Sequence, residues 1–252
     1  MNRILFEKDE ISDGVATFGG ERAEHVLNVL HGEVGQTLKT GEIDGGIGTS
    51  EIVEIVNDAD GGGPLIRANV CHDQKSLRPW VDLILAPPRP RVMKRLLPQL
   101  AAMGVGRIVL VGAKKVEKDF WGATLLKEEN YRPLLIDGLM QSGTSILPEM
   151  ICRRNFRRFV VDELDAMFPA TRRIVAHPYG EGVDVAGTSG TTRTAESSFD
   201  ASLLLAIGPE GGWIDEEVAL LESKGFARCS LGPRILRTDT ATIALLAHFG
   251  MA

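Results

Sequence analysis

The sequence predicts an α/β protein whose main domain holds a parallel sheet, preceded by a small β-barrel. From residue 81 onward, aliphatic runs alternate with helix-like stretches, which is the order typical of a parallel sheet with helices on both faces. Between residues 14 and 71, short β-prone pieces are separated by glycine-rich turns, and only residues 21–30 have a helical pattern. We therefore expect a barrel domain over residues 1–73 and an α/β domain over residues 78–252.

The α/β region begins with a strand, a helix and a second strand. Residues 81–86 are a continuous apolar run of strand length, and residues 107–111 are the next one. Between them, residues 92–103 repeat apolar side chains at helical spacing, and Pro98 should bend this helix. The apolar face predicted for the helix consists of Val92, Leu96, Leu100 and Met103.

Two further helices and two strands follow in the sequence. Residues 124–140 are expected to be helical with a break at Pro133, and residues 154–168 to form another helix. A polar stretch of low complexity, residues 187–198, predicts a mobile loop. The next strands are predicted from two short apolar runs, residues 174–176 and 202–207.

The last two helices have ends that can be predicted from the sequence. Asp215 is expected to be the N-cap of the first helix, and Gly225 follows its end. The second should begin at Thr238 or Asp239 as its cap and run to about residue 249. Both helices therefore begin directly after segments that are rich in glycine and proline.

Those two segments, residues 207–213 (IGPEGGW) and 231–241 (LGPRILRTDTA), carry most of the functional information. Each is expected to be a tight loop at the carboxyl end of a strand and beside a helix N-terminus, where open α/β sheets bind ligands. The sequence has no GxGxxG after a strand, no GxxxxGK[ST], no HExxH and no GxSxG. This argues against a Rossmann cofactor, a P-loop nucleotide, a zinc protease and an acyl-enzyme.

Charge is distributed unevenly along the chain. The net charge of −6 argues mildly against a protein that coats nucleic acid without specificity. Basic residues nevertheless cluster in residues 89–95, 114–118 and 153–158. Any one of these clusters alone is typical of a solvated helix face, whereas three in one half of the chain are compatible with a local RNA-facing surface. The RNA-binding residues expected on this basis are Arg89, Arg91, Lys94 and Arg95.

The cysteines and the apolar runs indicate the cellular compartment of the protein. Cys71, Cys152 and Cys229 are odd in number and far apart, which favours reduced thiols over a disulfide framework or a zinc site. The apolar runs are much shorter than the roughly 18 residues of a membrane span, and the charged start does not resemble a signal peptide. We expect a cytoplasmic protein with no bound metal and no membrane partner.

Residues 207–213 and 231–241, together with the AHP of residues 176–178, resemble the ribosomal RNA small subunit methyltransferase E family. The phrases HVLNVL (residues 25–30) and QSG (residues 141–143) add weaker support. This family belongs to the SPOUT superfamily, so the resemblance implies a C-terminal trefoil knot that binds S-adenosylmethionine, a PUA-like RNA-binding barrel and a homodimer. Family members methylate N3 of a uridine in 16S rRNA of the small ribosomal subunit.

The resemblance also implies which residues bind the cofactor, with Ile235 and Leu236 packing on its adenine. Glycines in these loops would allow the backbone to approach a ligand closely, although simple turn formation is the alternative explanation. The cofactor-binding residues implied are Ala176, His177, Pro178, Ile207, Gly208, Pro209, Glu210, Gly211, Gly212, Leu231, Gly232, Ile235, Leu236 and Thr238.

Methyl transfer to uracil N3 requires loss of a weakly acidic proton, so stabilising negative charge on O2 and O4 should matter more than a strong base. We expect Arg237 to be the main electrostatic catalytic residue. Glu210 is expected to organise the site or to accept the proton. The alternative is that Arg237 pairs with Glu210 or Asp239 and only holds the loop.

The sequence departs from the family pattern at His31, Met140, Thr144 and Ile146. Family members usually have other residues at these positions, and most of those residues are charged. These departures affect the substrate prediction more than the cofactor prediction. Two alternatives therefore stay open: a SPOUT methyltransferase with another RNA target, either another base or a ribose 2′-hydroxyl, and a non-catalytic RNA-binding protein of ribosome assembly.

Overall fold

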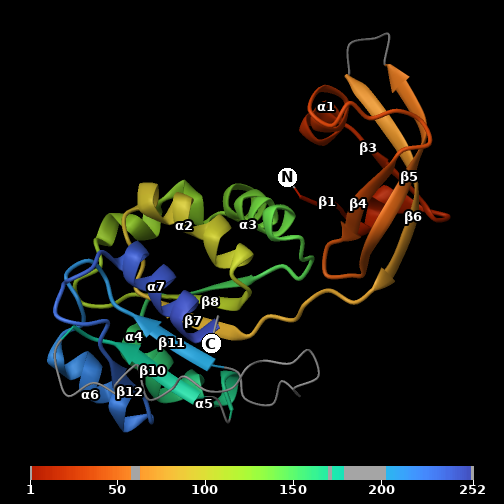
Figure 1. Cartoon of the computed structure of the whole chain (residues 1–252). Coiled ribbons are helices and arrows are strands. Elements are labelled where there is room, and N and C mark those ends of the chain that lie inside the picture. Colours follow the sequence, from red (N-terminus) through yellow and green to blue (C-terminus); the bar gives the residue numbers. More distant parts are fainter. Residues whose placement is uncertain (1, 58–62, 170–171, 179–202, 251–252) are drawn as a thin grey trace. The chain divides into compact units, whose positions relative to one another are not determined.

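The computed structural model of the chain (Figure 1) describes residues 2–57, 63–169, 172–178 and 203–250. The chain divides into two compact units. We call Met1–Arg78 with Ile136–Leu147 the N-terminal unit, and Pro79–Leu135 with Pro148–Ala252 the α/β unit. The predicted mobile loop, residues 187–198, lies outside the described residues.

The N-terminal unit is built on a six-stranded mixed sheet with the strand order β1-β4-β5-β6-β3-β2. β1 runs parallel to β4, and the other neighbouring pairs are antiparallel. The barrel predicted here is a curled sheet that stays open, because its edge strands β1 and β2 are very short and do not pair with each other in the described part of the chain (Figure 1). The strands are β1 Ile4–Phe6, β2 Ile11–Ser12, β3 Val15–Phe18, β4 Thr37–Glu42, β5 Ile47–Asn57 and β6 Pro64–Gln74.

One α-helix covers the hollow of this sheet. Helix α1, Gly20–Asn28, confirms the helix predicted from residues 21–30, and a short 3-10 helix, Lys8–Glu10, precedes β2. The buried side chain of Val26 packs into the same cluster as Phe6 and Phe18. Burial of these large apolar groups is the main force that holds such a small sheet together.

The QSG segment is part of the N-terminal unit. The carbonyl of Met140 accepts hydrogen bonds from the backbone N–H groups of Asn2 (3.0 Å) and Arg3 (3.1 Å). The Ser145 hydroxyl is buried and donates to the carbonyl of Gly45 over 2.7 Å. The segment around the QSG therefore serves at least in part to close the edge of the N-terminal sheet at β1.

The α/β unit contains the predicted parallel sheet. It has six strands in the order β12-β10-β11-β7-β8-β9, and every neighbouring pair is parallel. The two edge strands were not predicted, because they are short or only partly buried and lack a continuous apolar run. The strands are β7 Val81–Leu85, β8 Val105–Val111, β9 Glu149–Arg153, β10 Arg172–Ala176, β11 Leu203–Ile207 and β12 Ala227–Cys229.

Helices cover both faces of this sheet. Figure 1 shows α2 (Pro90–Ala102) and α7 (Thr238–Gly250) over one face, and the chain from α4 to α5 together with α6 (Asp215–Ser223) over the other. The second face holds one core cluster, in which Val109 and Leu204 of the sheet meet Phe159 and Leu221 of the helices. The predicted helix at residues 154–168 comprises α4 Phe156–Arg158, a π-helical turn Phe159–Glu163 and α5 Leu164–Met167.

Two predictions about prolines and helix faces need correction. The break predicted at Pro133 is absent, because α3 (Glu128–Ser142) continues through it. Only the Glu129 carbonyl in the first turn loses its i+4 donor, and this exposed end of the helix can use water instead. In α2, Val92 and Met103 lie at the edge of the apolar face and are only half-buried, while Met93, Leu97 and Ala101 join its centre.

The N-cap predicted at Asp215 is also wrong. Ile214 precedes the first helical residue of α6, and Asp215 makes no capping hydrogen bond. Glu217 reaches back instead, and its carboxylate accepts the backbone N–H of Ile214 over 3.1 Å. Gly225, with φ +81°, follows the helix as predicted. Short 3-10 helices at Lys118–Gly122 and Thr124–Leu126 complete the described elements.

Two further observations concern the predicted environment. Within the described ranges, each helix is too short or too polar to cross a membrane. None of the three cysteines is paired in the structure, and Cys229 is buried. The trefoil knot implied by the resemblance stays a prediction.

Candidate functional site

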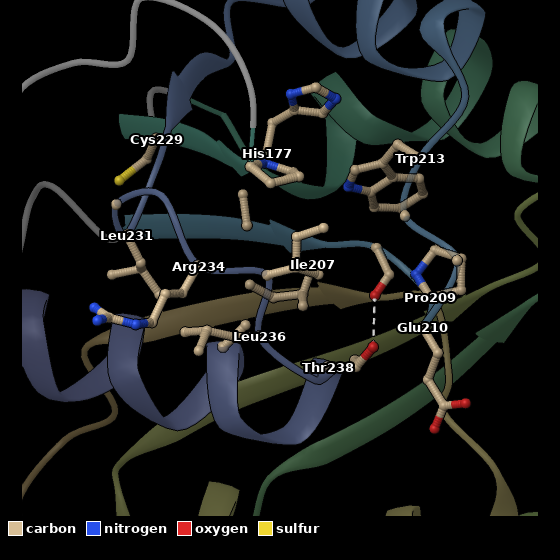
Figure 2. A pocket seen from close by; sticks show the side chains of 18 residues that line it. His177, Ile207, Pro209, Glu210, Trp213, Cys229, Leu231, Arg234, Leu236 and Thr238 are labelled. Atoms are coloured by element: carbon tan, nitrogen blue, oxygen red, sulfur yellow. Dashed lines mark hydrogen bonds between the residues drawn. The ribbon is translucent and has the colours of Figure 1, made fainter.

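The carboxyl ends of three neighbouring strands, β10, β11 and β12, surround a cavity of about 260 Å³ (Figure 2). The volume is close to the lower end of the roughly 300–1,000 Å³ typical of small-molecule pockets. All the residues expected to bind a cofactor line it: Ala176, His177, Pro178, Ile207, Gly208, Pro209, Glu210, Gly211, Gly212, Leu231, Gly232, Ile235, Leu236 and Thr238.

Four lining residues were missed by the sequence reasoning: Trp213, Cys229, Arg234 and Ala241. Three of them lie inside residues 207–213 and 231–241, the two segments already predicted to bind a ligand, so these segments contribute more residues to the cavity than predicted. Cys229 is the last residue of β12, a strand that the sequence pattern did not reveal. Burial raises the pKa of its thiol, which keeps Cys229 neutral in the wall of the cavity.

The loop after β11 is a tight turn whose glycines are required by the loop itself. The N–H of Gly212 donates to the carbonyl of Pro209 over 2.7 Å, and Gly212 has φ +70°. A Cβ atom on Gly208 would lie 3.1 Å from both the backbone nitrogen and the indole nitrogen of Trp213. Turn geometry therefore explains Gly208 and Gly212 before any ligand is considered.

Trp213 places an unpaired donor at the cavity. Its side chain is 5% exposed, and its ring packs on Phe156 with the centroids 5.2 Å apart. The indole N–H is buried and has no hydrogen-bond partner among the described residues. Figure 2 shows this nitrogen on the side of the ring that faces His177 and Ile207. A buried donor without an acceptor costs about 1–3 kcal/mol, so the site is suited to a molecule that brings an acceptor.

Hydrogen bonds connect the three segments that line the cavity. The backbone N–H of His177 donates to the carbonyl of Cys229 over 3.0 Å, which joins the ends of β10 and β12. The hydroxyl of Thr238 donates to the carbonyl of Gly208 over 3.2 Å, as the dashed line in Figure 2 marks. The start of α7 is thereby fixed to the loop after β11.

The segment between β12 and α7 forms an apolar wall that stays open to solvent. Gly232 has φ +100°, which turns the chain sharply after Leu231. Ile235 is 71% exposed and Leu236 is 36% exposed. These two apolar side chains at the rim of the cavity are therefore accessible to a bound molecule.

The charged residues around the cavity differ in position. Glu210 and Arg234 line it, whereas Arg237 is exposed and does not. The alternative in which Arg237 only pairs with Glu210 or Asp239 finds no support, since neither ion pair forms among the described residues. Asp239 instead lies 3.7 Å from the guanidinium of Arg95.

The four basic residues expected to bind RNA are all exposed, and they stand immediately before α2 and in its first two turns. The Arg89 guanidinium donates to Glu117 over 3.0 Å, and this carboxylate, with Glu210 nearby, raises the pKa of Arg89. Arg91 and Lys94 form no ion pair within the described ranges. Among the described residues there is also no group of three or more His, Cys, Asp or Glu that could hold a metal ion.

Residues 75–250 match the family model of the RNA methyltransferase domain. The ribosomal RNA small subunit methyltransferase E of Treponema pallidum (strain Nichols) is 28% identical over 249 residues, covering 98% of this chain and 90% of that protein. Ribosomal RNA small subunit methyltransferase E 1 of Borreliella burgdorferi is 23% identical over 247 residues, covering 97% and 95%.

The fold has counterparts among solved structures. The crystal structure of a ribosomal RNA small subunit methyltransferase E from Neisseria gonorrhoeae bound to S-adenosylmethionine superposes with a TM-score of 0.70 at 21% identity. The match covers 100% of this chain and 97% of that one. The combination of a curled N-terminal sheet and a parallel-sheet unit is thus an arrangement that occurs in solved methyltransferase structures.

Proposed function

We propose that this protein methylates N3 of a uridine in 16S rRNA. The chain belongs to the RNA methyltransferase domain family and, within it, to the ribosomal RNA small subunit methyltransferase E family. The reaction depends on S-adenosylmethionine. One observation supports the proposed site most strongly: two loops far apart in the sequence, residues 207–213 and 231–238, meet around a single cavity with residues 176–178.

The residues present fit S-adenosylmethionine. The unpaired indole N–H of Trp213 offers a donor, and the loop glycines leave backbone groups accessible at the cavity. Leu231, Ile235 and Leu236 offer an apolar surface that suits the face of an adenine ring. We propose that these side chains hold the adenosyl part, while the loop after β11 holds the rest of the molecule.

When bound, S-adenosylmethionine supplies an electrophilic methyl group: its carbon forms a bond to uracil N3 while the bond to sulfur breaks, and that electron pair stays on sulfur. The chain must orient the uracil and remove the N3 proton. We propose Glu210 as the acceptor of this proton. We propose Arg237, an exposed cation directly before α7, as a source of positive charge next to the substrate.

We propose that each of the two units contributes residues that bind rRNA. Arg89, Arg91, Lys94 and Arg95 present an exposed basic patch near the amino end of α2, which suits contact with an anionic RNA. The N-terminal unit, which corresponds mainly to the predicted domain of residues 1–73, is proposed as a PUA-like RNA-binding domain, and residues 78–252 as the SPOUT domain with its knot.

We propose that the protein works as a homodimer in the cytoplasm. The open side of the cavity next to Ile235 supports a dimer, because a second copy would close this side over a bound cofactor. The cytoplasm is proposed because small-subunit rRNA is the expected partner.

The proposal is tested by transfer of labelled methyl groups from S-adenosylmethionine to 30S subunits that lack N3-methylated uridine. Wild-type protein should label the 30S subunit, and Arg237→Ala should lower the rate while cofactor affinity, measured by calorimetry, stays unchanged. Turnover that survives Arg237→Ala would remove Arg237 from the mechanism. Binding of the cofactor without any transfer to RNA would favour a protein of ribosome assembly over an enzyme.

A further inference from the structure

A second cavity, of about 170 Å³, lies at the same edge of the parallel sheet. It is lined by the segments that follow β7, β8 and β11, which are neighbouring strands in the order β11-β7-β8. Its apolar lining comes from Pro87, Pro88, Val116, Pro209 and the buried ring of Phe120. Carboxyl ends of parallel strands are the usual place for ligands, so this cavity occupies the right edge for a substrate.

The two cavities share a wall. Pro209, Glu210 and Gly211, in the loop after β11, line both of them. Figure 2 shows the Glu210 side chain extending away from His177 and Leu231, so its carboxylate stands at the far side of the first cavity. The second cavity therefore adjoins the first at the loop after β11.

Four charged groups line the second cavity, two cations and two carboxylates. The ammonium of Lys115 donates to the carbonyl of Gly211 over 2.7 Å. This bond holds the ammonium at the residue that follows Glu210 in the sequence. Two of its three N–H donors remain for other partners. The guanidinium of Arg89 uses Nε to donate to Glu117 over 3.0 Å, and its terminal nitrogens form no hydrogen bond within the described ranges. Glu117 and Glu210 together raise the pKa of Arg89.

The donors and acceptors of these charged side chains match the hydrogen-bonding pattern along one edge of uracil. Uracil presents the acceptor O2, the donor N3–H and the acceptor O4 along a single edge. Lys115 and Arg89 can donate to the two oxygens, and the Glu210 carboxylate can accept from N3–H. Neutral cytosine has a lone pair at N3, which would meet a carboxylate with repulsion. The apolar lining suits the flat faces of a pyrimidine.

We infer that this cavity receives the target uracil, with Lys115 and Arg89 as the groups that recognise the base and stabilise the charge formed on it. The inference rests on the proposed function and adds the substrate subsite. In the step, the N3 proton passes to the Glu210 carboxylate, and the negative charge left on the ring is shared by O2 and O4. The two cations stabilise that charge before N3 attacks the methyl carbon. One proton is released to solvent for each methyl group transferred.

The test compares Lys115→Met with wild type on two substrates. These are 30S subunits without N3-methylated uridine, prepared from cells grown with or without 5-fluorouracil. Fluorine at C5 withdraws electrons and makes N3–H more acidic, so a fluorinated base depends less on nearby cations. Lys127→Met is the matched control, because Lys127 is an exposed lysine of the same unit, 66% exposed, and lines neither cavity.

We expect Lys115→Met to lower the turnover rate on ordinary 30S subunits by between about tenfold and a hundredfold. The loss should shrink on fluorinated subunits, and cofactor affinity by calorimetry and the melting temperature should match wild type. Arg89→Gln should behave in the same way, and Lys127→Met should equal wild type on both substrates.

Three results would overturn the inference. Unchanged turnover in Lys115→Met and Arg89→Gln would show that the cavity does not hold the base. An equal loss on both substrates would mean that the two cations bind RNA phosphate or only position the loop, and that they do not stabilise the charge on the ionised uracil ring. A wild-type protein that transfers no methyl group would overturn the proposed function first, and this inference with it.

Discussion

The hydroxyl of Thr238 donates a hydrogen bond to the carbonyl of Gly208 and so fixes the first turn of α7 to the loop after β11. Thr238 is only 4% exposed, and the hydrogen bond is partly buried. Both partners line the cavity assigned to the cofactor. The bond therefore couples the stability of the α/β unit to the shape of its site.

Replacing Thr238 by Val should weaken both properties. Valine keeps the shape but leaves the Gly208 carbonyl without its donor, which should lower the free energy of unfolding by about 1 kcal/mol. Affinity for S-adenosylmethionine should fall several-fold, measured by calorimetry. Thr238→Ser keeps the hydroxyl and is the control; wild-type stability and affinity in Thr238→Val would show that the hydrogen bond contributes to neither property.

Gly208→Ala should damage the site through Trp213. The new Cβ atom would lie 3.1 Å from the indole nitrogen and from the backbone nitrogen of Trp213, so the loop must shift. We expect about a tenfold loss of cofactor affinity, since a displacement worth 1.4 kcal/mol changes affinity tenfold. Gly122→Ala is the control, because no atom lies within 4 Å of its added Cβ. Wild-type affinity in Gly208→Ala would contradict this account of the glycine.

Trp213→Phe should separate binding from folding. Phenylalanine keeps an aromatic ring against Phe156 but removes the indole N–H that has no partner in the described protein. The melting temperature should change little, because no hydrogen bond of the unliganded protein is lost. Affinity for S-adenosylmethionine should fall by about 5- to 10-fold, the value of one hydrogen bond. An unchanged dissociation constant would mean that the indole does not contact the cofactor.

Glu217→Ala should destabilise the α/β unit strongly. The two carboxylate oxygens of this buried side chain accept the backbone N–H groups of Lys114 (2.7 Å) and Ile214 (3.1 Å). Removing them leaves two donors unpaired, which should cost about 2–4 kcal/mol in urea unfolding. Glu216→Ala, at the exposed neighbouring position, should cost almost nothing. A similar small effect at both positions would remove Glu217 as the residue that joins α6 to the segment after β8.

The stability of the N-terminal unit should depend on pH through His72. Burial lowers the pKa of His72, with Arg3 adding to this and Glu42 opposing it, and Nε2 lies 2.9 Å from the Thr40 hydroxyl. Above the unfolded-state pKa of about 6.5, both states are neutral and stability is full. As pH falls below that value, the unfolded chain takes up a proton that the folded chain resists, so stability falls until the folded-state pKa is reached.

Urea unfolding between about pH 7.5 and pH 5 measures this dependence. His72→Gln should remove part of the fall. His31→Asn is the control, because His31 is an exposed histidine of the same unit with φ +51°, a conformation that Asn tolerates. A fall in stability that is the same in wild type and His72→Gln would assign the pH dependence to other groups.

Much of the α/β unit could be predicted from the sequence because its strands are continuous apolar runs. β7 and β11 are buried on both faces, and such runs are visible without any alignment. The edge strands β9 and β12 were missed, since an edge strand needs fewer apolar residues. The N-cap at Asp215 was predicted from residue type alone, whereas the carboxylate that caps α6 belongs to Glu217 and also binds a segment a hundred residues earlier.

The site was predictable to the extent that it lies in contiguous motifs. All the lining residues expected from residues 207–212 and 231–238 meet in one cavity, because turn glycines and prolines leave a local sequence signal. The second cavity could not be predicted, since Arg89, Lys115 and Glu210 come together only when β7, β8 and β11 are placed side by side. Arg237 was chosen for its place in the motif, and its exposure became visible only in the structure.

The central claim is tested most directly by nucleoside mass spectrometry. Unmethylated 30S subunits are incubated with the wild-type protein and S-adenosylmethionine that carries a deuterated methyl group, and the 16S rRNA is then digested to nucleosides. The account predicts one deuterated product, N3-methyluridine. Label in another base, in a ribose 2′-O-methyl group or in no nucleoside at all would contradict it.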